Sequence, residues 1–295
     1  MISLDPDQRT PAKPRRRAAK GYANGVEPKW CPGCGDFGVL NAVHKALAAI
    51  GRAPHEIAFV SGGGCSSRIP EYTSAYGFNS LNGRALPIAQ GVKMARPELL
   101  VLVAGGDGDC FSAGGGHVCH AIRRNPDLTY LVMDNQVMGQ AGGQPSPTAP
   151  KGSKAPGSAY GTMGAPVNPV LYALAYGAHF VAQGIASDTD GLSRLIEEAI
   201  RFPGFAFINI ESPCAAFGTP GMKARAPGSA VRKLEAEGHN PSDRLKAMEL
   251  AGAYGKILYT GVFYRNPKPP PTLGTLIAKL QRFPAVRDEE AISSA

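Results

Sequence analysis

The sequence predicts an α/β fold, in which a mostly parallel β-sheet carries helices on both faces and ends in a C-terminal arm. Three observations support this prediction. Apolar runs of strand length alternate with helix-like stretches along the chain. Polar clusters, three of them glycine-rich, follow four of the apolar runs. The chain has 295 residues, of which 43% are hydrophobic and 18% charged, so it can bury a large core.

The alternation of apolar and mixed segments predicts the position of each strand and helix. Strand segments are short apolar runs such as LLVLVA, whereas helix segments mix apolar and polar residues, as in GLSRLIEEAIR. The strands are expected at 56–61, 99–104, 128–134, 178–182 and 205–210, and the helices at 36–50, 85–95, 112–124, 168–176 and 191–201. The segment ILYTGVFYRNP (257–267) is expected to form a further strand or hairpin. Residues 139–168 contain almost no large apolar side chain, and we interpret them as a lid over a bound ligand.

Composition and charge divide the chain into three parts. Residues 1–20 hold six basic and two acidic residues and are predicted to be a basic mobile tail. Residues 21–240 form the predicted ligand-binding domain, and residues 241–295 the C-terminal arm, which is expected to contact a partner. The net charge of +8 is too weak outside the tail to indicate nucleic acid. No apolar run is long enough for a membrane span and no signal peptide is visible, so a cytoplasmic location is expected.

The clusters that follow the strands share one end of the predicted sheet. GGGCSSR follows 56–61, GGDGDC follows 99–104, NQVMGQAGG follows 128–134 and ESPC follows 205–210. In parallel sheets, ligands bind beyond the carboxyl ends of the strands. The sequence therefore predicts a single site built from these four clusters.

A metal and diphosphate site is predicted within this edge. Asp107 lies between Gly106 and Gly108, and 26 residues separate Gly108 from Asn135. A carboxylate, an amide oxygen and a backbone carbonyl such as that of Val137 suit Mg²⁺, and the glycines let a diphosphate approach the backbone. This spacing resembles the thiamine-diphosphate motif of thiamine-dependent enzymes. The predicted cofactor-binding residues are Gly106, Asp107, Gly108, Asp109, Asn135, Val137, Gly139 and Ser66.

Four of the six cysteines lie in turn-rich segments: Cys31, Cys34, Cys65 and Cys214. Of these, Cys65 and Cys214 follow predicted strands at this edge. Cys110 flanks the predicted helix 112–124 and Cys119 lies on it, and both are expected to be small buried residues. In a reducing compartment, loop thiolates indicate zinc, an iron–sulfur cluster or a redox dithiol. A structural zinc site usually pairs two short CxxC elements, and here only Cys31 and Cys34 are closely spaced. The wide spacing of the others favours a cluster held by a folded sheet.

Several motifs together resemble the β subunit of 2-oxoacid:ferredoxin oxidoreductases. The similarity runs from about residue 22 to 265 and rests on CPGCGDFG, GGGCSSRIPEY, LNGRALPIAQGVKMA, GGDGD, MDNQVMG, GGQPSPT and ESPC. It implies a thiamine-diphosphate-binding fold, with Mg²⁺ held by Asp107, Asn135 and Val137. It also implies one four-iron–four-sulfur cluster ligated by Cys31, Cys34, Cys65 and Cys214. The implied reaction is oxidative decarboxylation of a 2-oxo acid, with the acyl group passing to coenzyme A and single electrons to ferredoxin.

The segment after Cys65 resembles that of the 2-oxoglutarate type. Arg68 is predicted to present its planar guanidinium to the distal carboxylate of the substrate. Ser66 and Asn82 are the other predicted catalytic residues. Relatives often have His where this chain has Asn79 and Asn82, and amides cannot titrate near neutral pH. Pyruvate and branched or aryl 2-oxo acids remain alternative substrates.

The resemblance also implies a partner. The glutamate that activates thiamine lies in the α subunit of the family, so this chain alone is expected to be inactive. The expected assembly is a dimer of αβ heterodimers. Two other functions stay open: a non-redox thiamine-dependent decarboxylase subunit with a structural zinc site, and a cysteine-rich binding subunit.

Overall fold

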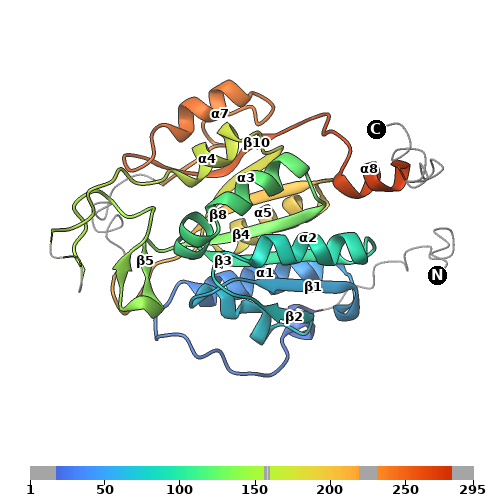
Figure 1. Ribbon diagram of the computed structural model, residues 1–295, viewed down its shortest axis with the longest axis horizontal. Coiled ribbons are helices and arrows are strands. Elements are labelled where there is room, and N and C mark those ends of the chain that lie inside the picture. Colours follow the sequence, from blue (N-terminus) through green and yellow to red (C-terminus); the bar gives the residue numbers. More distant parts are fainter. Residues whose placement is uncertain (1–17, 156–157, 159, 219–230, 281–295) are drawn as a thin grey trace, which may run out of the picture.

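The computed structural model describes residues 18–155, 158, 160–218 and 231–280, and within them the main sheet has eight strands in the order β2-β1-β3-β4-β8-β7-β10-β9. Figure 1 shows the sheet with helices in front of it and behind it. Its strands are β1 (Ile57–Ser61), β2 (Tyr76–Asn79), β3 (Leu100–Gly106), β4 (Leu128–Asp134), β7 (Phe180–Ile185), β8 (Phe205–Glu211), β9 (Val231–Lys233) and β10 (Leu258–Arg265). All neighbours are parallel except β10, which runs antiparallel to β7. The predicted α/β class and mostly parallel sheet are confirmed.

Each face of the sheet has its own hydrophobic core. On one face lie α1 (Asp36–Ile50) and α5 (Thr189–Arg201), packed against each other. The other face carries α2 (Ala85–Ala95), α3 (Gly115–Arg124), α4 (Pro169–Ala175) and α7 (Arg244–Ala251). Alternate residues of a strand enter opposite cores, which is why the strands are continuous apolar runs.

The strand register brings four strand ends to one edge. Ser61 of β1 pairs with Ala104 of β3, and Asp134 of β4 pairs with Glu211 of β8. The loops after β1, β3, β4 and β8 therefore leave the sheet side by side. The hairpin of β5 (Val137–Met138) and β6 (Gln144–Pro145) lies at this end, on the left in Figure 1, while α8 (Leu273–Leu280) lies at the opposite end.

The structure differs from the sequence prediction mainly at short or exposed elements. The five predicted strands and five helices are present, but helix 112–124 begins at Gly115, after a π-helical turn at Asp109–Ala113. Strand β2 was not predicted because it is a four-residue edge strand with every residue exposed. None of the helices in the described part of the chain is long and apolar enough to cross a membrane.

The ends of the chain are described only in part. Residues 1–17 of the predicted tail and residues 281–295 of the predicted arm lie outside the described residues. The last residues of the predicted tail, 18–20, are described, and Ala19 begins the short 3₁₀ helix η1 (Ala19–Tyr22). Tyr22 in this helix is buried. In the segment predicted as an arm, α7 packs against α4 and β10 pairs with β7, so the sheet extends beyond residue 240.

Candidate functional site

Asp107, directly after β3, is the most constrained residue of the site. Its side chain is almost wholly buried. Oδ2 accepts hydrogen bonds from the Gln136 backbone N–H at 3.0 Å, from the Thr148 hydroxyl at 2.5 Å and from the Ser146 hydroxyl. Oδ1 is also buried but accepts no hydrogen bond from the described residues. One carboxylate oxygen is thus fixed by the protein, and the other has the free lone pairs that a metal ligand needs.

The other two predicted metal ligands lie on a strained turn beside Asp107. Gln136, between Asn135 and Val137, has a φ of 63°, which is uncommon outside glycine. The Asn135 side chain accepts a hydrogen bond from the Val137 N–H at 2.9 Å, which closes this turn. Because the Gln136 N–H is bonded to Asp107, the turn that carries Asn135 and Val137 lies against the Asp107 carboxylate.

The glycines around Asp107 give room for neighbouring side chains. A Cβ on Gly108 would lie 2.7 Å from Cγ of Met138. A Cβ on Gly106 would lie 3.6 Å from Oγ of Ser66. We call residues 106–108, which carry the predicted ligand Asp107, the metal loop. Met138 and Ser66 approach the backbone of this loop from segments that follow two other strands. The sequence analysis predicted Ser66 at this site.

Two further buried carboxyl groups lie close to Asp107. They are Asp134 and Glu211, at the ends of β4 and β8, and both are fully buried. Oδ1 of Asp134 lies 2.8 Å from the Thr148 hydroxyl, whose single proton Asp134 and Asp107 share, and Oδ2 accepts a hydrogen bond from Nδ2 of Asn209 at 3.3 Å. Burial, with the nearby Asp107 and Glu211, raises the pKa of Asp134 well above its usual value, and burial also raises the pKa of Asp107. A divalent cation at Asp107 would favour the charged forms of these carboxyl groups.

Hydrogen bonds hold the cysteine-bearing segments together. Nε1 of Trp30 donates to the carbonyl of Cys65 at 2.8 Å. The N–H of Gly35, next to Cys34, donates to the carbonyl of Pro213, next to Cys214, at 3.0 Å. The CPGC turn is therefore joined to both distant cysteine segments.

We call the segments that carry Cys31, Cys34, Cys65 and Cys214 the cysteine rim. Neighbouring thiols of the rim affect each other's pKa values. Burial is the main cause that raises the pKa of Cys34 to about 12, and the charges of Asp36, Cys214 and Cys65 add to it. The pKa of Cys65 is raised by burial and by Asp36, Cys214 and Cys31. Cys31 is exposed, while the other three are half-buried. Within the described residues, no three His, Cys, Asp or Glu side chains are gathered closely enough to hold one metal ion.

Asp36 connects the cysteine rim to the metal loop, and sequence reasoning missed it. It is buried at the start of α1 and accepts a hydrogen bond from the Ser212 hydroxyl at 2.6 Å. Ser66 and Cys34 lie close enough to this carboxyl group to lower its pKa, whereas burial, the larger effect, raises it. The available sequence signal was a carboxylate two residues after CPGC, where a helix N-terminus favours negative charge.

Known proteins with similar sequences and structures identify the family of this chain. The family model "Thiamine pyrophosphate enzyme, C-terminal TPP binding domain" matches residues 62–210, and the model for the C-terminal part of the pyruvate ferredoxin oxidoreductase beta subunit matches residues 229–281. The β subunit of 2-oxoacid:ferredoxin oxidoreductase 1 from Aeropyrum pernix is 36% identical, over 85% of this chain and 82% of the relative. This chain belongs to the family of 2-oxoacid:ferredoxin oxidoreductase β subunits. The resemblance inferred from the motifs is therefore confirmed.

Other family members differ in how much of their length is matched. The 2-oxoglutarate oxidoreductase subunit KorB of Mycobacterium tuberculosis is 38% identical over 81% of this chain, but over 64% of its own length. The β subunit of oxidoreductase 2 from A. pernix is 44% identical over 64% of this chain and 61% of the relative. The chain thus spans less than two thirds of these two curated relatives.

A solved structure of the family matches almost the whole chain. It is a 2-oxoglutarate:ferredoxin oxidoreductase from Magnetococcus marinus with 2-oxoglutarate, coenzyme A and succinyl-CoA bound. The TM-score is 0.86 at 40% identity, and the match covers 96% of this chain and 98% of that chain. The fold predicted from the resemblance is therefore confirmed.

The predicted substrate residues form contacts within the protein. Arg68, on η3 (Ser66–Tyr72), pairs through Nε and Nη2 with the Glu71 carboxylate at 3.1 Å, and its guanidinium lies 5.9 Å from the Tyr72 ring centroid. Glu71 also accepts a hydrogen bond from Asn79 at 3.0 Å. The Asn82 side chain occupies the space that a Cβ on Gly63 would need. Arg68 and Asn79 are thus coupled through Glu71, while Asn82 packs on the loop before Cys65.

The predicted lid has structure of its own. Val137–Met138 and Gln144–Pro145 form a hairpin around η5 (Gly139–Ala141), which contains Gln140. Gly139 borders the rim, because a Cβ there would lie 3.6 Å from Sγ of Cys65. The following Ser146 and Thr148 reach back to Asp107. The segment therefore covers the metal loop, and its opening and closing stay a prediction.

The two cysteines outside the rim behave differently. Cys110 is fully buried, as predicted. Cys119 is only half-buried, and its Sγ lies 3.2 Å from the Gly116 carbonyl oxygen. It falls on a face of α3 that the core does not cover, so its predicted burial was wrong.

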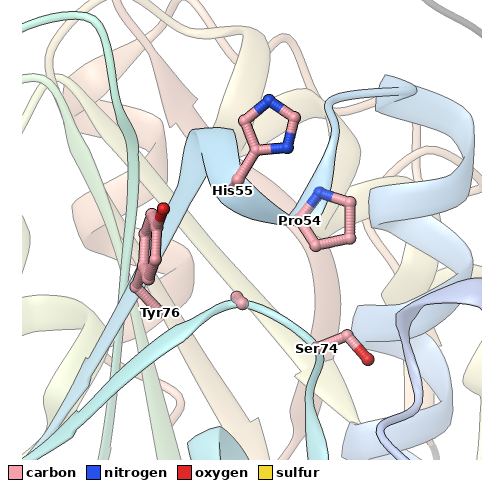
Figure 2. Close-up of a pocket in the computed structure, with 5 residues that line it drawn as sticks. Pro54, His55, Ser74 and Tyr76 are labelled. Atoms are coloured by element: carbon pink, nitrogen blue, oxygen red, sulfur yellow. The ribbon is translucent and has the colours of Figure 1, made fainter.

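A separate hollow lies away from these residues. It is lined by Pro54, His55, Ser74, Ala75 and Tyr76. Figure 2 shows His55 and Pro54 from the turn before β1 and Tyr76 from the edge strand β2 around it. None of the predicted site residues lines this hollow.

Proposed function

We propose that this chain, with an α partner, catalyses the conversion of 2-oxoglutarate and coenzyme A to an acyl-CoA and CO₂, with single electrons passing to ferredoxin. The observation that carries the proposal is the junction formed by Ser66. This residue follows Cys65, lies close to the Asp36 carboxyl group and lies beside Gly106. A metal–diphosphate loop and a cysteine rim that adjoin in this way suit a decarboxylation coupled to one-electron transfer.

Asp107, Asn135 and the Val137 carbonyl would hold Mg²⁺, and the diphosphate would lie against the glycines of the metal loop. The free, buried Oδ1 of Asp107 supports this assignment because a buried acceptor without a donor is otherwise costly. Gly106, Gly108 and Gly139 would let the cofactor approach the backbone. Thiamine diphosphate, when bound, supplies the carbanion chemistry that a 2-oxo acid requires. The residues of this chain hold and orient it, and the Ser146–Thr148 segment shields the Asp107 carboxylate.

Cys31, Cys34, Cys65 and Cys214 would ligate one four-iron–four-sulfur cluster, which accepts electrons singly. The hydrogen bonds of Trp30 and Gly35 support this assignment because they hold three distant segments at one rim. Ligating thiols must be deprotonated, and the raised pKa of Cys34 opposes this. Cluster assembly should therefore release protons and proceed better at higher pH.

Arg68 would favour a substrate with a distal carboxylate. Its Nε and Nη2 are held by Glu71, and Nη1 makes no hydrogen bond with the described residues. A guanidinium fixed on one side is preorganised to donate from the other. The relatives named 2-oxoglutarate oxidoreductase or synthase subunits agree with this choice.

The proposed assembly is a dimer of αβ heterodimers in the cytoplasm. The relatives are described as subunits, which supports an α partner that completes the thiamine site. Coenzyme A would be the co-substrate and ferredoxin the electron acceptor. The region from residue 241 onward is proposed to contribute to the contact with the partner.

The proposal is tested by a substrate panel on the co-expressed αβ complex. We expect 2-oxoglutarate-dependent ferredoxin reduction by the complex and none by this chain alone. Iron and acid-labile sulfide should be present; zinc in their place would support the non-redox alternative. Arg68→Ala should lower kcat/KM for 2-oxoglutarate by about 10–100-fold relative to pyruvate, since a hydrogen bond to a charged group is lost. Equal losses on both substrates would remove the carboxylate argument, and Arg52→Ala, at a distant ion pair with Glu56, serves as the control.

A further inference from the structure

Asp109, two residues after Asp107, is directed at the backbone of two other loops. It is nine-tenths buried, with 8% of its surface exposed. Its Oδ1 accepts hydrogen bonds from the Gly63 N–H at 2.9 Å and from the Gly83 N–H at 2.6 Å. These two glycines are distant in sequence from each other and from Asp109. One carboxylate oxygen therefore fastens two loops to the end of β3.

The glycines that surround Asp109 make this contact possible. A Cβ on Gly62 would collide with the Asp109 carboxylate, and a Cβ on Gly105 would lie 2.8 Å from its Oδ2. Gly83 has a φ of 74° and packs against the backbone of residues 113 and 114. The Asn82 side chain in turn occupies the Cβ space of Gly63. The two loops and the π-helical turn thus interlock around a single side chain.

The fastened loops carry the residues on which electron transfer would depend. Gly63 lies two residues before Cys65, a proposed cluster ligand, and three before Ser66. Gly83 follows Asn82 and precedes α2. Asp109 itself belongs to the same turn as Asp107, the proposed metal ligand. The hydrogen bonds of its carboxylate therefore connect the metal loop to the loop that precedes Cys65.

We infer that Asp109 is a positioning residue that fixes the Cys65 loop relative to the metal loop, and so sets the path that electrons cross between the two cofactors. The inference rests on the proposed function for its consequence, but its geometry concerns only this chain. Each turnover would convert a 2-oxo acid, coenzyme A and two oxidised ferredoxins to an acyl-CoA, CO₂, a proton and two reduced ferredoxins. The role requires the side-chain oxygen of residue 109 that accepts the two hydrogen bonds, and it does not require a negative charge. Asparagine at this position should therefore preserve the role.

Amide hydrogen exchange tests the geometric part without any turnover. In the αβ complex, Asp109→Ala should speed exchange of peptides that contain Gly63 and Gly83 by at least about 10-fold, because their acceptor is removed. Asp109→Asn should leave these rates close to those of the wild type. Asp190→Ala, an exposed carboxylate on α5 that pairs with Lys45, is the control and should change neither peptide. Unchanged exchange in Asp109→Ala, or equal effects of Ala and Asn, would overturn the inference.

Single-turnover kinetics test the functional part. In Asp109→Ala, the rate at which 2-oxoglutarate bleaches the cluster absorbance, per cluster present, should fall by about 10–100-fold, as expected for a displaced reacting pair. The affinity for Mg²⁺ and thiamine diphosphate should change little, and Asp109→Asn should restore the rate. A loss of thiamine affinity as large as that of Asp107→Asn would instead make Asp109 a cofactor ligand and overturn the positioning role. If the wild-type complex shows no cluster bleaching, the proposed function fails, while the exchange result still decides the role of Asp109.

Discussion

Gly35→Ala should open the cysteine rim without altering any cysteine. Gly35 lies between the CPGC turn and α1, with helical dihedral angles of φ −61° and ψ −26°. Alanine adopts this conformation readily, and by itself the exchange would stabilise the fold by about 0.4–1 kcal/mol. A Cβ at this position, however, would lie 2.6 Å from both Cδ of Pro213 and Oγ of Ser212. The steric contact therefore decides the outcome.

The magnitude follows from these contacts. Ordinary van der Waals contact begins near 3.4 Å, so the segment before Cys214 must move away from Gly35 by about 1 Å. Overpacking of this kind costs about 1–3 kcal/mol. The movement also breaks the 2.6 Å hydrogen bond from Ser212 to the buried Asp36, which costs about 1–3 kcal/mol more. We expect a net destabilisation of about 2–5 kcal/mol and a displacement of Cys214 from Cys34.

The assay measures iron, acid-labile sulfide and the thermal midpoint of the purified αβ complex. Gly35→Ala should lower the cluster content strongly while the complex remains assembled. The matched control is Gly91→Ala in α2, where a Cβ meets nothing within 4 Å, and it should leave the cluster intact and the protein slightly more stable. Full cluster content in a Gly35→Ala complex whose thermal midpoint has fallen would refute the assignment of Cys34 and Cys214 to one cluster, and an unchanged thermal midpoint would refute the steric argument.

Two further predictions concern the metal loop and the fold. Asp107→Asn should weaken Mg²⁺-dependent binding of thiamine diphosphate, measured by calorimetry, by at least about 100-fold, because even outer-shell partners of metal ligands contribute about 10–100-fold; unchanged affinity would exclude Asp107 as a ligand. Asp188→Ala should cost about 1 kcal/mol at neutral pH, because Asp188 caps α5 by accepting the Gly191 N–H at 2.9 Å. The pKa of Asp188 is lowered by this hydrogen bond and by Lys233, so its stabilisation is present above the unfolded pKa of about 3.9 and is lost as pH falls through the lower folded value. The difference in thermal midpoint between the two proteins should narrow in that range, and a constant difference down to low pH would contradict the argument.

Much of the fold and the type of site could be predicted because the relevant signals are local. Buried parallel strands are continuous apolar runs, so β1, β3, β4, β7 and β8 were found close to their observed bounds. The exposed edge strand β2 has no such pattern and was missed. Asp107, Cys65 and Cys214 were singled out by residue type and by their positions after strands, and Cys31 and Cys34 by their CxxC spacing in a turn-rich segment. The supporting residues Asp36, Ser146 and Thr148 were missed because hydroxyl groups and single carboxylates occur everywhere in sequences.

The sequence by itself determined the parallel α/β fold, the end of the sheet where the predicted ligand-binding residues lie, and the chemistry that their side chains permit. Only the tertiary structure decided which atoms meet. It showed that Oδ2 of Asp107 is occupied while Oδ1 is free, that Asp36 joins three segments, and that Asp109 holds two loops. The physical reason is that each of these contacts joins residues far apart in the chain. Their distances are set by strand register and close packing, which no local sequence pattern encodes.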